Sequence, residues 1–205
     1  MILKRKGINL IISAPSGVGK STMIKRLLVE DKNLVYSISA TTRPKRDNEI
    51  DGVDYYFKSQ EEFYKLITTN SFIEYAEVFG HFYGTLTKDI TLRLQSGLDI
   101  LFDLDWQGST VLKNKMPEDT VGIFILPPSI NELERRITSR GTDKKEVIAY
   151  RMAKSRSEIA HYSDYDYIII NDRLEEALKE IKAIILAHRL RRDKIINIDN
   201  FIHSL

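Results

Sequence analysis

The sequence predicts an α/β fold built on a parallel sheet, and three observations lead to this expectation. Short, almost uninterrupted apolar runs alternate with amphipathic stretches along the 205 residues, which is typical of parallel strands covered by helices on both faces. A glycine-containing turn joins the first apolar run to the first amphipathic stretch. Two polar segments interrupt the alternation without a linker around them, so we expect a single domain with two insertions.

The expected strands are the apolar runs, which are short and rich in β-branched or aromatic residues. They cover residues 8–12, 34–39, 99–104, 122–126 and 167–170. Because the runs are nearly continuous rather than alternating, each strand is expected to be buried on both faces.

The expected helices follow from apolar residues at helical spacing. The first covers about residues 20–30, with one apolar stripe formed by Met23, Ile24, Leu27 and Leu28. A long helix follows Asn171, with an apolar stripe formed by Leu174, Leu178, Ile181 and Ile185.

Two segments do not fit the α/β alternation. Residues 41–97 are polar, with turn signals and two aromatic clusters, and residues 131–157 are helical and rich in arginine, with a break at Gly141. We therefore expect a core of about residues 1–38, 98–130 and 158–205, an insertion at about 39–97, and a second, mobile insertion at about 131–157.

Composition limits the classes of function. Lys and Arg number 31 against 29 Asp and Glu, so the net charge of +2 gives no argument for a nucleic-acid or membrane partner. The absence of cysteine excludes disulfides, cysteine-based metal sites and thiol nucleophiles. It fits a reducing compartment, and the cytoplasm is the expected location. No apolar run approaches the roughly 18 residues of a membrane-spanning helix.

The strongest chemical signal is a phosphate-binding loop between the first strand and the first helix. Residues 14–21 read Ala-Pro-Ser-Gly-Val-Gly-Lys-Ser. Gly17 and Gly19 would let backbone N–H groups point at a phosphate, and the helix N-terminus adds a positive dipole. Lys20 would reach the β and γ phosphates, and the Ser21 hydroxyl would bind Mg²⁺.

One position departs from the usual pattern of this loop. Ala14 stands where the pattern G-x-x-x-x-G-K-[ST] has its first glycine. Its single methyl group is compatible with the loop if its φ angle is negative.

A second signal is the carboxylate at the end of the strand at 99–104. Asp103 follows an apolar run, as does the carboxylate that faces Mg²⁺ in many nucleotide-binding proteins. Many strands end in Asp, so this prediction depends on the phosphate loop beside it.

Further motifs indicate which phosphoryl-transfer reaction is expected. Together with the phosphate loop, they resemble the motifs of the guanylate kinase family, occur in the same order, and cover nearly the whole chain. They are Thr-Thr-Arg-Pro at 41–44, Gly-Val-Asp-Tyr-Tyr-Phe at 52–57, Phe-Ile-Glu-Tyr at 72–75, Tyr-Gly-Thr at 83–85, Asp-Leu-Asp-Trp-Gln-Gly at 103–108, Arg-Gly-Thr at 140–142 and Asn-Asp at 171–172. The resemblance implies a three-layer P-loop NTPase fold with a parallel core sheet, a mixed α+β GMP-binding insertion and a helical lid.

The resemblance also assigns substrates and residues. It implies ATP and GMP as substrates and Mg²⁺ as the cofactor. The phosphate of GMP falls on Arg43, Arg46, Tyr55 and Tyr83, and the guanine on Ser39, Glu74, Thr85 and Asp105, with Asp103 also at this site. ATP falls on the loop and helix residues Ala14, Pro15, Ser16, Gly17, Val18, Gly19, Lys20, Ser21 and Thr22, on the lid arginines Arg136, Arg140 and Arg151, and on Asn171 at the adenine. Arg135 is an alternative to Arg136.

The expected chemistry needs few catalytic groups, because the attacking oxygen of the GMP phosphate is already anionic. Catalysis then consists of positioning and charge stabilisation by Lys20, Arg43, Arg46, Arg136, Arg140, Arg151 and Asp103. The expected activity is phosphorylation of GMP to GDP by ATP in purine nucleotide metabolism. We expect dGMP to be used as well, since no residue identified reads the ribose 2′-hydroxyl.

Two other functions stay open at this point. One is a kinase of a different nucleoside monophosphate, which would share the loop chemistry. The other is a non-catalytic interaction module that uses the same insertion to bind a peptide. The presence of Lys20, Ser21, Arg140 and Arg151 favours the enzyme. Oligomeric state is not readable from the sequence.

Overall fold

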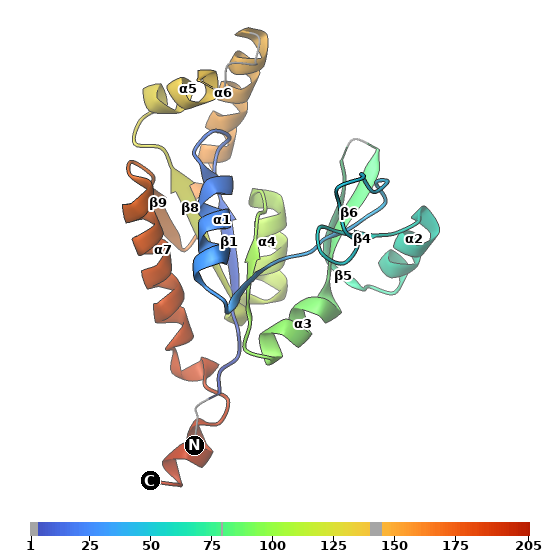
Figure 1. Cartoon of the computed structure of the whole chain (residues 1–205), viewed down its shortest axis with the longest axis vertical. Helices are drawn as coiled ribbons and strands as arrows, with labels where there is room; N and C mark the ends of the chain where they lie inside the picture. The colour runs from blue at the N-terminus through green and yellow to red at the C-terminus, as the bar shows by residue number, and fades with distance from the viewer. Residues whose placement is uncertain (1–3, 79, 140–144) are drawn as a thin grey trace.

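The computed structural model describes residues 4–78, 80–139 and 145–205 (Figure 1). Its centre is a five-stranded sheet with the strand order β2-β7-β1-β8-β9, in which every neighbouring pair is parallel. The strands are β1 (Asn9–Ser13), β2 (Leu34–Tyr36), β7 (Asp99–Phe102), β8 (Thr120–Leu126) and β9 (Tyr167–Ile170). The expected parallel sheet is confirmed, and its carboxyl ends lie at one edge.

Helices cover both faces of this sheet. On one face lie α1 (Lys20–Glu30) and α7 (Leu174–Arg189), whose buried apolar residues join those of β1 and β8 in one core cluster. On the other face, α3 (Thr87–Gln95) and α4 (Trp106–Lys115) enclose a second cluster around Ile11, Phe102 and Phe124. The three-layer α/β fold and the first helix are as the apolar pattern predicts.

A second, mixed sheet lies to the side of the core. It contains β3 (Ala40–Thr41), β4 (Tyr56–Phe57), β5 (Phe72–Val78) and β6 (His81–Leu86) in the order β4-β3-β6-β5, with α2 (Gln60–Thr68) against it. Ala40, Phe63 and Phe72 form its separate small core. These elements all fall within residues 39–97, and we call them the insertion; α3, in the same range, packs on the central sheet.

A pair of helices stands above the carboxyl ends of the central strands (Figure 1). It consists of α5 (Ile130–Thr138) and α6 (Lys145–Ile159), and we call it the α5–α6 pair. The break predicted at Gly141 lies outside the described residues. The chain ends in the short helix α8 (Ile198–Ile202). Among the described residues, no helix combines the length and the apolar character needed to cross a bilayer.

Two expectations about strands were wrong. The run at 34–39 forms a strand only to Tyr36, because the chain then leaves the central sheet and enters the insertion through β3. The strand at 167–170 was expected to be buried on both faces, but Ile168 and Ile170 are 42% and 49% exposed. β9 is the edge strand of the sheet, so its apolar side chains lack neighbours on one side.

Candidate active site

The loop between β1 and α1 encloses a cavity of about 280 Å³. Its lining consists of Ala14, Pro15, Ser16, Gly17, Gly19, Lys20, Ser21, Thr22 and Glu158. Gly17 and Gly19 have φ angles of 93° and 104°, a left-handed conformation that side chains with a Cβ rarely adopt. Among the described residues other than glycine, only Asn70 has a positive φ. Ala14 therefore meets the condition under which its methyl group is compatible with the loop.

The back of the loop is held by residues from distant parts of the chain. The buried Asn171 amide donates to the Val18 carbonyl oxygen at 2.7 Å, and the Arg136 guanidinium donates to the Asn171 carbonyl oxygen at 3.0 Å. The Val18 side chain is 1% exposed and packs in the core. The sequence prediction of an ATP contact at Val18 thus concerns its backbone alone, while the prediction for Asn171 at the adenine stays a prediction.

Lys20 opens α1 and reaches the end of the neighbouring strand β7. Its ammonium group forms an ion pair with the carboxylate of Asp103, and the side chains are 23% and 28% exposed. The pair stands at the carboxyl edge of the parallel sheet, where ligands of such folds bind. The structure therefore brings together two predicted residues that are 83 positions apart in the sequence.

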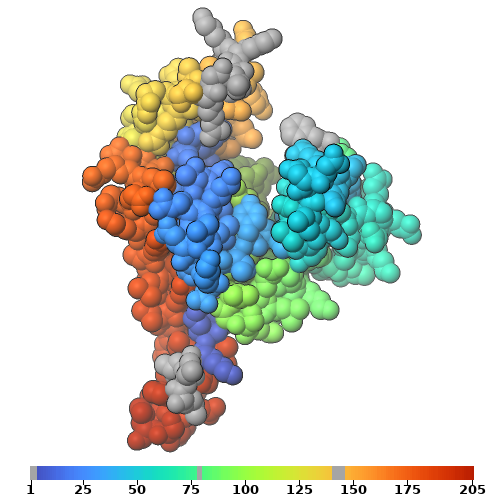
Figure 2. Space-filling view, viewed as in Figure 1, coloured from blue at the N-terminus to red at the C-terminus, as the bar shows by residue number. Residues whose placement is uncertain are grey.

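A second cavity, of about 170 Å³, lies between the insertion and the core. It is lined by Tyr36, Ser37, Ser39, Asp54, Tyr55, Tyr83, Thr85, Phe102, Asp103 and Leu104. Five of the predicted GMP-binding residues are in this set. Figure 2 shows the surface hollowed between the insertion, in cyan, and the α5–α6 pair, in yellow and orange. Asp103 belongs both to this cavity and to the ion pair with Lys20.

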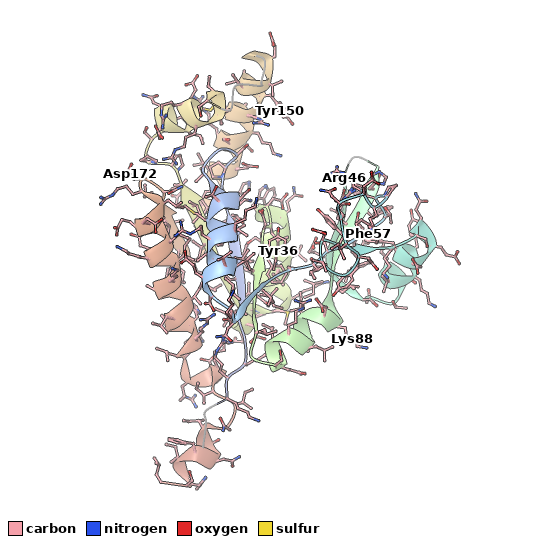
Figure 3. The ribbon with its side chains drawn as sticks, viewed as in Figure 1. Tyr36, Arg46, Phe57, Lys88, Tyr150 and Asp172 are labelled. Atoms are coloured by element: carbon pink, nitrogen blue, oxygen red, sulfur yellow. The ribbon has the colours of Figure 1, made fainter. Side chains whose placement is uncertain are left out.

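Arg43 is held by a carboxylate of the insertion. Its guanidinium lies 2.6 Å from the Glu49 carboxylate and 5.3 Å from the centre of the Tyr55 ring. The other Glu49 oxygen accepts a hydrogen bond from the backbone N–H of Arg46 at 2.8 Å. The Arg46 side chain itself is exposed, at the upper end of the insertion in Figure 3. Hydrogen bonding to Arg43 lowers the pKa of Glu49.

The predicted guanine-reading carboxylate is partly buried. Glu74 on β5 faces Thr85 on β6, and the Thr85 hydroxyl donates to its carboxylate at 2.5 Å. Burial raises the pKa of Glu74, and the nearby Asp105 carboxylate raises it further. Asp105 caps α4 by accepting the Gly108 N–H at 3.0 Å. Two carboxylates thus lie near one another and offer several acceptor oxygens to a ligand that donates.

The arginines of the α5–α6 pair differ in what they reach. Arg135 and Arg136 both donate hydrogen bonds to the Glu132 carboxylate. These bonds, of which the one from Arg135 has the larger effect, lower the pKa of Glu132 to about 2. Arg135 is 69% exposed at its side chain, whereas Arg136 extends to the phosphate loop. Arg151 lies partly exposed on α6, and Arg140 lies outside the described residues. Of these two arginines, Arg136 is therefore the better candidate for the predicted contact with ATP.

Comparison with known proteins agrees with this arrangement. The sequence model of the family described as guanylate kinase matches residues 6–188. The chain is 46% identical to the guanylate kinase of Agrobacterium fabrum, over 99% of this chain and 92% of the relative, and 47% identical to that of Cereibacter sphaeroides, over 99% and 97%. The crystal structure of guanylate kinase from Anaplasma phagocytophilum is 36% identical, with a TM-score of 0.74, and covers 99% of this chain and 97% of that one. The chain belongs to the guanylate kinase family.

Sequence reasoning missed three side chains that this guanylate kinase family member places at the site. Tyr36 lines the cavity at the insertion and lies between α1 and the insertion in Figure 3. Although it is 41% exposed, burial raises the pKa of its hydroxyl to about 12, and Asp103 adds to the rise. Glu49 binds Arg43, and Glu158 lines the phosphate loop. The sequence signal that could have indicated Glu49 is its place six residues after Arg43, in the same turn-rich segment. No sequence signal identified Glu158.

The donor set near the phosphate loop fits the Mg²⁺ ion expected for the family. Mg²⁺ prefers oxygen ligands and usually keeps several waters, so one or two protein oxygens beside substrate phosphates are enough. The exposed Ser21 lines the cavity of the phosphate loop together with Lys20, and the Asp103 carboxylate pairs with Lys20, so both residues offer such oxygens. In the part of the chain that the structure describes, no group of three or more metal-ligating side chains forms a cage.

Proposed function

We propose that this phosphotransferase moves the γ-phosphoryl group of ATP to the phosphate of GMP, producing ADP and GDP, with dGMP as a second acceptor. The observation that carries the proposal is the position of Asp103. It joins the cavity at the insertion, lined by Tyr55 and Tyr83, to Lys20 of the phosphate loop. The residues expected to bind the GMP phosphate and those expected to bind the ATP phosphates thus adjoin the same carboxylate. This arrangement favours a reaction between two phosphorylated substrates.

The insertion would hold the acceptor. Arg43 presents a guanidinium supported by the faces of Tyr55 and Phe57, at 5.3 and 5.9 Å from the ring centres. A guanidinium can bind two phosphate oxygens at once, and Arg46 and Tyr83 would add further donors. Ser39, Glu74, Thr85 and Asp105 would read the guanine edge. Held in this way, the attacking phosphate oxygen is oriented toward the phosphate loop.

The core and the α5–α6 pair would hold the donor. Backbone N–H groups of residues 14–22, apart from Pro15, which has none, would surround the ATP phosphates. Lys20 would follow the transferred group, and Arg136, Arg140 and Arg151 would stabilise its charge. Mg²⁺ bound with Ser21 would neutralise charge on the phosphate oxygens. Asn171 would lie toward the adenine. No general base is needed, because the nucleophile is already anionic.

Three parts of the chain would have separate roles in binding the substrates. Residues of about 1–38, 98–130 and 158–205 form the nucleotide-binding core, about 39–97 the GMP-binding insertion, and about 131–157 the lid. Closure of the insertion and the lid would exclude water and prevent hydrolysis of ATP. We place the reaction in purine nucleotide metabolism of the cytoplasm.

The test measures kcat/KM with ATP and each of GMP, dGMP, IMP and AMP. Guanine offers two neighbouring donors that Glu74 can accept, IMP lacks one of them, and adenine has a lone pair where guanine N1 carries a hydrogen. We expect GMP to exceed AMP on the order of 10⁴-fold, with IMP between them. Glu74→Gln should lose activity with GMP specifically.

The same assay separates the alternatives. Equal use of AMP and GMP would make the protein a kinase of another nucleoside monophosphate and would remove the guanine-reading role of Glu74. Absence of turnover with every nucleotide, in a folded protein, would favour the non-catalytic interaction module.

A further inference from the structure

A carboxylate of helix α6 contacts the phosphate loop. The Oε2 atom of Glu158 accepts a hydrogen bond from the backbone N–H of Ser16 at 3.3 Å. One turn earlier, the buried Ser155 hydroxyl donates to the Ser16 carbonyl oxygen at 3.5 Å. The last turn of α6 therefore holds both sides of one residue in the loop.

This contact places a negative charge among donors suited to phosphate. Glu158 lines the 280 Å³ cavity of the phosphate loop and also the adjoining 60 Å³ cavity, and Lys20 lines both. Its side chain is 22% exposed, and the cation that pairs with it among the described residues, Lys154, is 4.0 Å away and 61% exposed. A weak, solvated ion pair of this kind leaves the charge of Glu158 largely uncompensated. The carboxylate is therefore directed at the loop.

Phosphate and this carboxylate compete for the same donor. Ser16 lines the cavity of the phosphate loop, and backbone N–H groups that point into such loops bind phosphate. Two anions within a few ångströms of each other repel, and most strongly where water is scarce. ATP phosphates that occupy the loop would therefore force Glu158 to give up the Ser16 N–H.

Because Glu158 lies on α6, loss of its bond to Ser16 would also change how the end of this helix is held. Arg151 lies seven residues earlier on the same helix, two turns away and on the same face. A shift of the last turn of α6 would therefore move the segment that carries Arg151. His161 follows the helix directly and stacks on Trp106 with ring centres 3.9 Å apart and planes 5° apart.

We propose that Glu158 is a positioning residue that competes with the ATP phosphates for the Ser16 N–H, so that ATP binding releases the last turn of α6 and repositions Arg151. This inference rests on the proposed ATP site at the loop. It assigns to one carboxylate the coupling between occupation of the phosphate loop and the position of the α5–α6 pair.

The experiment compares wild type with Glu158→Gln, which keeps the shape of the side chain and removes its charge. Glu146→Gln is the matched control, because it makes the same charge change on α6 about 18 Å away along the helix axis. Calorimetry measures Kd for ADP with Mg²⁺, and steady-state kinetics measure KM for ATP and for GMP. Emission from Trp106, the single tryptophan of the chain, reports on the stack with His161.

We expect Glu158→Gln to bind ADP about threefold to tenfold more tightly, as a charged hydrogen bond is replaced by a neutral one. KM for ATP should fall in parallel and KM for GMP should not change. Trp106 emission of the variant without nucleotide should already resemble that of the wild type with ADP. Glu146→Gln should match the wild type in all these measurements.

Weaker or unchanged ADP binding in Glu158→Gln would overturn the inference, since the carboxylate would then support the loop or play no part there. Tighter binding without any change in Trp106 emission would overturn the coupling to α6. Lack of ADP binding by the wild type would instead refute the proposed ATP site. Glu158→Asp provides a second variant that retains the charge with a shorter reach, and its ADP affinity should lie between those of the wild type and Glu158→Gln.

Discussion

Strand β7 has an aspartate at each end, and the two carboxylates have different surroundings. Asp99, at the start, is fully buried and accepts hydrogen bonds from Arg5 at 2.6 and 2.9 Å, from Arg189 at 2.6 Å and from the Ile8 N–H at 3.0 Å. Asp103, just past the end, is 28% exposed and pairs with Lys20. The aspartate at the start of the strand thus accepts hydrogen bonds from three residues, whereas the aspartate past its end has one charged partner.

This difference is the one expected between a carboxylate that holds the fold together and one that is available to a ligand. The partners of Asp99 come from the chain's beginning and from α7, so their ion pairs tie distant segments to the sheet. A buried charge must be fully paired, because leaving it short of partners is costly. Asp103 stands at the carboxyl edge, where a single exposed partner can exchange for a ligand.

The largest expected effect concerns stability at the buried end. Asp99→Asn should lower the free energy of unfolding by about 3–5 kcal/mol, because Arg5 loses its charged partner and Arg189 keeps only Asp31. Asp103→Asn should lower it by less than about 1 kcal/mol, as for other partly exposed pairs. Urea denaturation of both variants measures the difference, and equal losses would remove the distinction between the two ends.

The next effect concerns turnover at the exposed end. Lys20→Ala should lower kcat by about 100- to 1000-fold, because a charge that stabilises the transferred phosphoryl group is removed. Its stability should stay close to that of the wild type. The exposed Lys25→Ala on the same helix is the control. An unchanged kcat in a folded Lys20→Ala protein would refute the assignment of Lys20.

A smaller effect should distinguish two neighbouring arginines. Arg136 reaches the carbonyl oxygens of Val18 and Asn171, whereas Arg135 binds only Glu132 among the contacts described. We expect Arg136→Ala to lower kcat about tenfold or more and Arg135→Ala to change it less than about twofold, with the affinity for GMP unchanged in both. The reverse order would restore Arg135 as the residue that acts on ATP.

The smallest effect is a pH dependence of stability at Glu74. Its pKa is raised in the folded protein, chiefly by burial, so the folded state favours the neutral carboxyl group. The resulting stability is present below the unfolded pKa and is lost as the pH rises through the folded pKa. Glu74→Gln should therefore become more stable relative to the wild type between pH 4 and pH 7. A constant difference in unfolding free energy across this range would contradict the burial of the charge.

Much of the core was predictable because its signals are local. The apolar stripe of residues 20–30 and the glycines before it depend on neighbours within a few positions, and α1 begins and ends where the pattern indicates. The run at 34–39 failed for a non-local reason, since the sequence does not show where the chain leaves one sheet for another. The exposure of Ile168 and Ile170 likewise depends on strand order, which places β9 at an edge.

The sequence by itself determined the family and the phosphate loop, because both lie in short motifs with fixed spacing, and it predicts most of the residues that would meet the two substrates. Only the tertiary structure decided which polar and charged groups contact one another. The pairs Lys20 with Asp103 and Ser16 with Glu158 join residues that are far apart in the sequence. Their contact depends on how parallel strands and the helices above them pack, and electrostatic energy depends on distance in space rather than along the chain.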